Sequence, residues 1–455
     1  MCGALLAAGC ATAAEVDRES LPPIEIQEPI PGAALPASAT PPEEVHLGPD
    51  ATLDDFRRYA ARHNPGLEAL QHEWSSARQR APQARALPDP RFGYTEFVEE
   101  VQTRTGPQER KFSLSQSFPW FGKRGLRGSV EEEGARVVWH RFLGAELALD
   151  YELRRTYAEY YFLGKSILIT RDNLELLSRL ESVARQKLAA GASNHPDIIR
   201  LQVELGRQED RLRALQEMRR PLTAKLNSIL NRPLDTEIPW PTELPSLEAE
   251  IDAEKLVLEM EAQNPELRAL QHEIRRAKLQ RKLAGKEYFP DFSVGIETIN
   301  TGSAVNPNTP DSGDDPWALM FTVEVPIWFA KYRAGEREAE ERWRSARRHH
   351  VDQKNRLLSD LEVALYDRRD AQRRIFLYQN TLIPKAEESL VATETAFRAG
   401  TADFLDLIDA QRVLLEFQLI RERALADRLR AHAELDRLVG RYVLNPDSQL
   451  KEERQ

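Results

Sequence analysis

The chain has 455 residues and a formal net charge of −10, and 30% of its residues are charged. An acidic balance, with arginine interleaved among glutamate, argues against a nucleic-acid partner. Long stretches rich in Ala, Leu, Glu and Arg are typical of extended, solvated helices rather than of one compact core. No run of about 18 apolar residues occurs, so the sequence predicts no membrane-spanning helix.

The N-terminal residues 1–14 are short, apolar and rich in small side chains, which is typical of an export signal. Two interpretations stay open. "LAAGC" resembles a lipoprotein signal that would make Cys10 a lipid-attachment residue, whereas "ATAAE" offers ordinary cleavage. The only other cysteine is Cys2, so no disulfide or thiolate metal site is expected in the folded part. Residues 15–52 carry repeated prolines and predict an extended linker.

One phrase occurs twice, as "NPGLEALQHE" from Asn64 and as "NPELRALQHE" from Asn264. Each copy is followed by a helical stretch, a Pro-Asp step, two alternating segments, a very long helical run and a glycine-containing turn. This order predicts a two-fold internal repeat. The expected domains are a first repeat at 53–230, an inter-repeat linker at 231–250, a second repeat at 251–444 and a polar tail at 445–455.

Four short segments alternate apolar and polar residues with a period of two, which predicts strands. They lie at 92–98, 111–118, 292–296 and 317–325, and each is expected to be about nine residues long. The charged helices offer little core for the apolar faces, so we favour membrane strands over a soluble hairpin. Four strands are too few, since about eight are needed to close a barrel. Open edges cannot remain in lipid, so the chain must pool its strands with other copies.

Two runs with few helix breakers predict unusually long helices, from Gly125 to Leu188 and from Ala330 to Phe397. Pro384 interrupts the second run, where a kink or a locally open turn is expected. Each long helix turns at a glycine and returns as a shorter helix. The sequence therefore predicts antiparallel helices with a strand patch at one end and two helix–turn–helix tips at the other.

These features resemble the TolC-like outer-membrane efflux channel family, also called outer membrane factors. The resemblance rests on the repeat, on the corners "SFPWFGKRGLR" and "VPIWFAKYRAGE", and on the tip "AGTADFLDLIDAQ". The phrasing is closest to heavy-metal and cation efflux members. The family implies an α+β membrane protein in which three chains share a twelve-stranded barrel in the outer membrane, with the helices forming a periplasmic α-barrel.

The resemblance also implies a function. The chain would be a passive trimeric duct that exports small solutes, heavy-metal cations or drugs, and would be neither an enzyme nor a cofactor protein. Its partners would be outer-membrane lipid, a periplasmic adaptor (membrane fusion protein) and an inner-membrane efflux pump. The alternative is a soluble periplasmic coiled-coil scaffold or adaptor, which would have no need of the four strands.

The family closes its tunnel with aspartate rings, and the matching residues here are Asp406 and Asp409. Three copies of such a carboxylate near one axis would narrow the tunnel and attract cations. The alternative is that both are ordinary acids near a helix N-terminus. The best-known family member has arginine where this chain has Ala402, so a latch salt bridge at that position is absent.

The tip turns are the expected adaptor contacts, because small residues allow close helix approach, although an ordinary turn would use the same residues. They comprise Ala190, Gly191, Ala192, Ser193, Ala399, Gly400, Thr401 and Ala402. No metal site is expected. "HEWSS" and "HEIRR" lack the second histidine of a zinc helix, and the adjacent His349 and His350 point to different helix faces.

Overall fold

The structure is a computed structural model, and it describes residues 47–48, 50–189, 195–247, 251–306 and 308–440. The expected signal segment with Cys10, nearly all of the proline-rich linker, the polar tail and the turn 190–193 lie outside these ranges.

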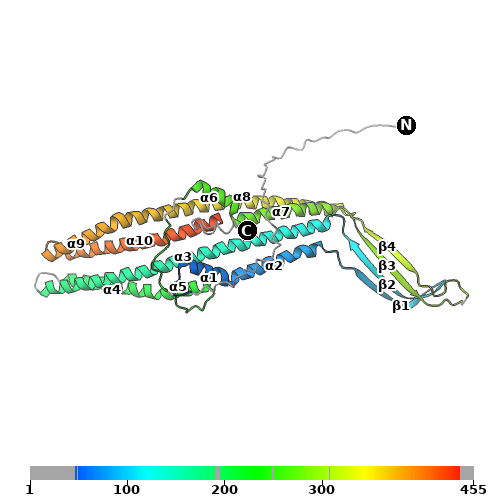
Figure 1. Cartoon of the computed structure of the whole chain (residues 1–455), viewed down its shortest axis with the longest axis horizontal. Coiled ribbons are helices and arrows are strands. Elements are labelled where there is room, and N and C mark those ends of the chain that lie inside the picture. The colour runs from blue at the N-terminus through cyan, green and yellow to red at the C-terminus, as the bar shows by residue number, and fades with distance from the viewer. Residues whose placement is uncertain (1–46, 49, 190–194, 248–250, 307, 441–455) are drawn as a thin grey trace, which may run out of the picture. The chain divides into compact units, whose positions relative to one another are not determined.

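Helices and strands follow one another in the same order in the two halves of the chain (Figure 1). The first half contains α1 Leu53–His63, α2 Pro65–Arg85, β1 Arg91–Thr103, β2 Gly106–Phe118, α3 Lys123–Ala189, α4 His195–Glu217 and α5 Arg219–Ile229. The second contains α6 Ala253–Gln263, α7 Pro265–Lys286, β3 Asp291–Thr301, β4 Trp317–Glu324, α8 Phe329–Leu377, the π-helix η1 Tyr378–Leu382, α9 Ile383–Ala399 and α10 Phe404–Val439. The two-fold repeat is therefore confirmed.

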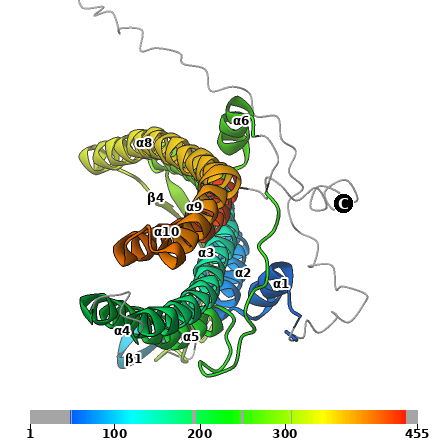
Figure 2. The same cartoon turned by 90° about the vertical axis from the view of Figure 1, so that its left-hand side faces the viewer.

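The long helices pack side by side. Viewed from the tip end they form a curved layer, and α1 and α6 lie on its convex side (Figure 2). Helix α3 contacts α2, α7 and α10, and α8 contacts α7 and α10. The 67 residues of α3 span about 100 Å at 1.5 Å per residue. No helix among the described residues combines the length and the apolar character needed to cross a bilayer.

The phrase that occurs twice holds each half together. Asn64 and Asn264 each end one helix and cap the next, with the side-chain oxygen accepting from the backbone N–H groups two and three residues on at 2.9–3.2 Å. The proline that follows fits the first helical position, where no N–H is needed. The side-chain nitrogen of Asn64 donates to the carbonyl of Ile229 at 3.3 Å, and that of Asn264 to the carbonyl of Leu438 at 2.8 Å. One side chain thus joins three helix ends in each half.

Two hydrophobic cores occupy matching positions in the two halves. The first contains Phe56, Leu153, Tyr157, Leu226 and Leu230, and the second contains Leu256, Leu361, Leu365, Leu435 and Val439. Leu361 stands 208 positions after Leu153, whereas Leu435 stands 209 positions after Leu226. The second half therefore carries one extra residue between these points.

The extra residue lies in the π-helix η1, which interrupts the second long helical run just before Pro384. A π-turn bonds residues five apart instead of four, so it accommodates one additional residue. Proline lacks the N–H that an α-helix requires and clashes with the carbonyl four residues earlier. The break expected at Pro384 is confirmed, and it takes the form of a widened turn.

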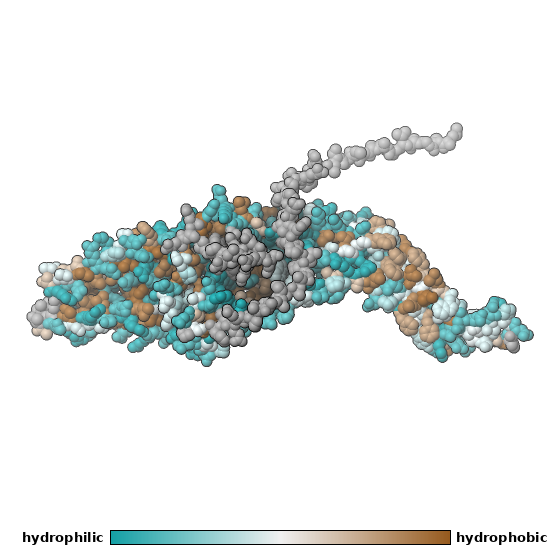
Figure 3. Space-filling model, viewed as in Figure 1, coloured by the Kyte–Doolittle hydropathy of each residue, from teal (hydrophilic) through white to brown (hydrophobic). Residues whose placement is uncertain are grey.

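The four strands form one antiparallel sheet in the order β1-β2-β3-β4. One row of apolar side chains runs across all four strands, through Phe92, Leu114, Ile296 and Leu319. Leu319 is 80% exposed, and apolar residues gather over the part of the sheet nearest the helices (Figure 3). The expected length of about nine residues was wrong for three strands, which have 13, 13 and 11 residues. They extend into polar hairpin ends that carry no apolar alternation.

Candidate gate at the helical tip

The described tip turn joins α9 to α10 through Ala399–Ala402. Gly400 has a φ of 78°, a left-handed conformation that favours glycine after a helix. The carbonyl of Ala396 accepts hydrogen bonds from the backbone N–H of Thr401 at 2.9 Å and from its hydroxyl at 3.1 Å. The turn is therefore tightly closed. The matching turn of the first half lies outside the described residues.

Asp406 takes part in capping α10. The helix begins after Asp403, whose carboxylate accepts from the N–H of Phe404 at 2.6 Å. The carboxylate of Asp406 accepts in turn from the backbone N–H of Asp403 at 3.2 Å, which completes a capping box. Asp406 is nevertheless exposed. It therefore stabilises the helix start while its charge remains open to solvent, and a place in a pore stays a prediction.

Asp409 belongs to a series of charged side chains that links the two helical hairpins. Its carboxylate lies 3.5 Å from the guanidinium of Arg412. Arg412 also donates to the carboxylate of Glu204 on α4 at 2.6 Å. Glu204 is buried and accepts a second bond from Gln208 at 2.9 Å. Neither Arg412 nor Glu204 was predicted from the sequence.

The ionisation of this pair follows from its surroundings. Burial favours the neutral form of Glu204, but hydrogen bonds from Arg412 and Gln208 and the nearby positive charges outweigh it, so its pKa lies below the ordinary 4.5. The hydrogen bond to Glu204 raises the pKa of Arg412. Both groups stay charged near neutral pH and link α4 to α10. A groove of about 590 Å³ beside them is bordered by Arg207, Arg211 and Arg423.

Beneath these charges the two hairpins share one apolar cluster. Phe397 and Phe404 flank the turn, with ring centroids 5.6 Å apart. They pack with residues from α3, α4 and α10, namely Leu177, Leu180, Ala184, Ile198, Leu201, Leu407 and Ile408. The tip is thus a packed four-helix unit with acids on its surface.

At the other end of the long helices, a buried lysine fixes the corner between helix and sheet. Lys123 is 2% exposed, and its ammonium lies 2.9 Å from the carboxylate of Asp291 and 3.4 Å from that of Glu287. It also donates to the carbonyl of Phe289 at 3.1 Å. The N–H of Trp120 donates to Asp291 at 2.7 Å. These bonds tie the start of α3 to the start of β3.

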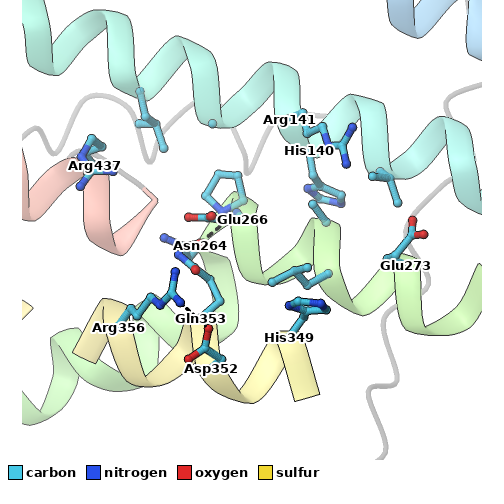
Figure 4. Close-up of a pocket in the computed structure, with 16 residues that line it drawn as sticks. His140, Arg141, Asn264, Glu266, Glu273, His349, Asp352, Gln353, Arg356 and Arg437 are labelled. Carbon is cyan, nitrogen blue, oxygen red and sulfur yellow. Dashed lines mark hydrogen bonds and ion pairs between the residues drawn. The ribbon is translucent and has the colours of Figure 1, made fainter. Parts of the chain in front are cut away.

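A cavity of about 670 Å³ lies among α3, α7, α8 and α10. His140 and His349 face it from different helices, with Arg356 and Asp352 nearby (Figure 4). Among the described residues, no group of three His, Cys, Asp or Glu side chains is placed to hold a metal ion. The cavity therefore offers polar and charged walls but no cluster of metal ligands.

Long helices in a curved layer, joined at one end to a sheet with an exposed apolar face, form the arrangement expected of an outer-membrane channel subunit. Residues 256–441 match the family described as "Outer membrane efflux protein". The cobalt-zinc-cadmium resistance protein CzcC of Cupriavidus metallidurans is 22% identical over 86% of this chain and 90% of its own length.

Solved structures show the same fold. The outer membrane protein VceC of Vibrio cholerae has a TM-score of 0.72 at 17% identity, covering 86% of this chain and 96% of VceC. CusC has a TM-score of 0.73 at 15% identity, covering 86% of this chain and 92% of CusC. The expected fold class and the outer-membrane location are confirmed, and the soluble scaffold loses its support.

Proposed function

We propose that the chain is the outer-membrane duct of a tripartite efflux system and works as a homotrimer. The observation that carries the proposal is the four-stranded sheet. Its apolar face is exposed, and the outer edges of β1 and β4 have no strand partner among the residues that the structure describes. Backbone groups at such edges must be paired inside lipid, and closure requires strands from further copies. Three copies would supply twelve strands. The duct is passive and not an enzyme.

The partners and cargo follow from the same proposal. The tip turns, 190–193 and 399–402, contact a periplasmic adaptor, which joins the duct to an inner-membrane pump. Exported solutes are small, and cations of heavy metals are the favoured class. The similarity to a cobalt-zinc-cadmium resistance protein supports this class, as does a tip whose Asp406 and Asp409 attract cations.

The lipid-facing side of the sheet can be tested with neighbouring residues of one strand. Leu319 belongs to the exposed apolar row, whereas the side chain of Met320 points to the opposite face. An arginine facing the bilayer midplane costs about 2–4 kcal/mol. Leu319→Arg should therefore abolish heat-resistant oligomers in outer-membrane fractions, and the control Met320→Arg should retain them. Normal assembly of Leu319→Arg would overturn the proposal.

The gate can be tested by removing charge while leaving the capping bonds possible, since asparagine also accepts hydrogen bonds at a helix start. We expect Asp406→Asn with Asp409→Asn to raise single-channel conductance in planar bilayers and to weaken cation preference. Asp197→Asn is the matched control, because Asp197 occupies the corresponding position on α4. Unchanged conductance and selectivity in the double variant would remove both aspartates from the gate.

A further inference from the structure

The junction between β2 and β3 joins the first repeat to the second, while β4 and β1 are left at the two outer edges of the sheet (Figure 1). Because the chain contains the same unit twice, the inner junction is a template for contact between two copies. We infer that β4 of one copy pairs with β1 of the next in the β2–β3 register. Three ion pairs lock this contact: Glu324 with Arg91, Lys331 with Asp89, and Glu341 with His72. The inference rests on the self-association in the proposed function.

The strands of the two repeats can be matched residue by residue. Gly93 in β1 and Gly295 in β3 each stand four positions after the aspartate of a Pro-Asp step and lie within the same apolar alternation. Phe118 and Val325 each end the apolar face directly before a proline. These anchors place β3 202 positions after β1, and β4 207 positions after β2. The observed β2–β3 register then fixes one β4–β1 register.

In the β4–β1 register, two charged residues take the positions that two serines occupy in the β2–β3 pair. Ser117 faces Ser293 in the sheet, with their hydroxyl oxygens 3.0 Å apart. The matching positions are Glu324 and Arg91. Within its own chain Glu324 stands opposite Asp291, and like charges directly opposite are unfavourable. An arginine on the open side of β4 would offset that repulsion.

The corner phrases give the second pair. "WFGK" ends at Lys123 and "WFAK" ends at Lys331, while the Pro-Asp steps end at Asp89 and Asp291. Lys123 is buried against Asp291 at 2.9 Å. Lys331 and Asp89 are both exposed, and neither forms an ion pair with any residue that the structure describes. The template therefore supplies each with the partner it lacks.

The aromatic contact at the same corner repeats the pattern. Trp120 stacks on Phe289 with ring centroids 5.4 Å apart. Their counterparts, Trp328 and Leu87, are 72% and 37% exposed in the single chain. Contact between copies would cover both side chains, which adds apolar burial to the ion pairs.

The third pair comes from the repeated phrase itself. Its "LQHE" portion puts His72 and His272 at matching positions, and the 208-residue spacing of the long helices matches Glu133 with Glu341. His272 is 3% exposed and lies 2.7 Å from the carboxylate of Glu133. Each glutamate also binds an arginine three residues further on, at 2.7 and 3.0 Å. His72, in contrast, is exposed, and its one ion-pair neighbour among the described residues is a glutamate on its own helix at 3.8 Å.

The inferred register can be tested by disulfide cross-linking. The template pair Ser113–Glu297 predicts that Met320 of one copy faces Thr95 of the next, just as Glu324 faces Arg91. All four side chains lie on the face opposite the apolar row. We would make four double-cysteine variants: Met320→Cys with Thr95→Cys, Glu324→Cys with Arg91→Cys, and the two exchanged combinations.

Copper phenanthroline would be added to intact outer membranes, and products would be separated with and without reductant. The two predicted combinations should give covalent dimers and trimers, and the exchanged ones should not, since their strand positions differ by four residues, about 13 Å. A link within one chain is excluded, because β1 and β4 lie three strand spacings apart, about 14 Å, and disulfides need Cα atoms within about 7 Å. The parent chain measures any background from Cys2 and Cys10.

Charge reversal gives an independent measurement. Lys331→Glu or Asp89→Lys alone should lower the temperature at which the oligomer dissociates, and the two together should restore it. Heat-resistant oligomers that cross-link only in the exchanged combinations, or charge reversals without rescue, would overturn the inferred register. A parent chain that forms no oligomer would overturn the proposed function itself.

Discussion

The repeated asparagine allows a matched pair of substitutions at its two positions. Asn264 is 3% exposed, and its two side-chain groups make separate contributions. Loss of the cap in Asn264→Ala costs about 1 kcal/mol. The carbonyl of Leu438 loses its 2.8 Å donor in a buried place, which costs about 1–3 kcal/mol more. Asn64→Ala loses the same cap, but its bond to Ile229 is 3.3 Å long and only partly buried. We therefore expect losses of about 2–4 kcal/mol at Asn264 and about 1–2 kcal/mol at Asn64.

The assay is thermal unfolding of the detergent-solubilised protein followed by circular dichroism at the helix band. Asn264→Ser separates the two contributions, because serine caps a helix but is too short to reach the carbonyl of Leu438. It should unfold at a temperature between those of the parent and Asn264→Ala. An equal lowering of the midpoint by Asn64→Ala and Asn264→Ala would contradict the separate contribution of the Leu438 bond, as would an Asn264→Ser variant that unfolds like the parent.

Three further predictions concern a buried histidine, backbone conformation at two glycines and the ion pair at the tip. Burial lowers the pKa of His432 from 6.5 to about 4, so the unfolded chain takes up the proton first as the pH falls. The stability of the folded protein should therefore decrease as the pH drops from about 6.5 to about 4. His432→Gln should flatten this dependence in thermal unfolding measured at several pH values. Gly440 and Gly400 both have positive φ, so replacing either with alanine should cost about 1–2 kcal/mol of stability. Gly440→Ala should lower the melting temperature more than Gly400→Ala, because a Cβ at Gly440 would also lie 2.9 Å from the carbonyl oxygen of Gln263. Because the pKa of Glu204 is lowered, its contribution to the stability of the fold is present above about pH 4.5 and is lost on further acidification. Glu204→Gln should cost about 1 kcal/mol at neutral pH and should remove this loss of stability in acid. An unchanged dependence of stability on pH in the variant would contradict the ion pair between Glu204 and Arg412.

The elements that the sequence predicted well are those with strong local signals. Strict alternation through Leu319 marked a strand, and the run without proline from Gly125 to Leu188 marked one continuous helix, observed as Lys123–Ala189. The position of Pro384 predicted a break, because proline acts on the turn it belongs to. The repeat made the two halves easier to interpret, since each supported the assignment of the other.

Contacts between distant segments carry no such signal. Glu204 and Arg412 are 208 positions apart, and only the packing of α4 beside α10 brings them together. The capping role of Asp406 could have been predicted from the sequence, because an acid three residues after Asp403 is a known pattern at helix starts. Strand lengths were underestimated where polar hairpin ends continue the ladder without apolar residues to mark them.

The widened turn η1 has a consequence for how the two halves can diverge. An extra residue in an ordinary α-helix would rotate everything beyond it by about 100° and turn the buried stripe toward solvent. Because η1 absorbs the addition within five residues, the side chains before and after it keep their facing. A duplicated segment can in this way change its length by one codon while both of its ends remain in phase with the ancestral copy.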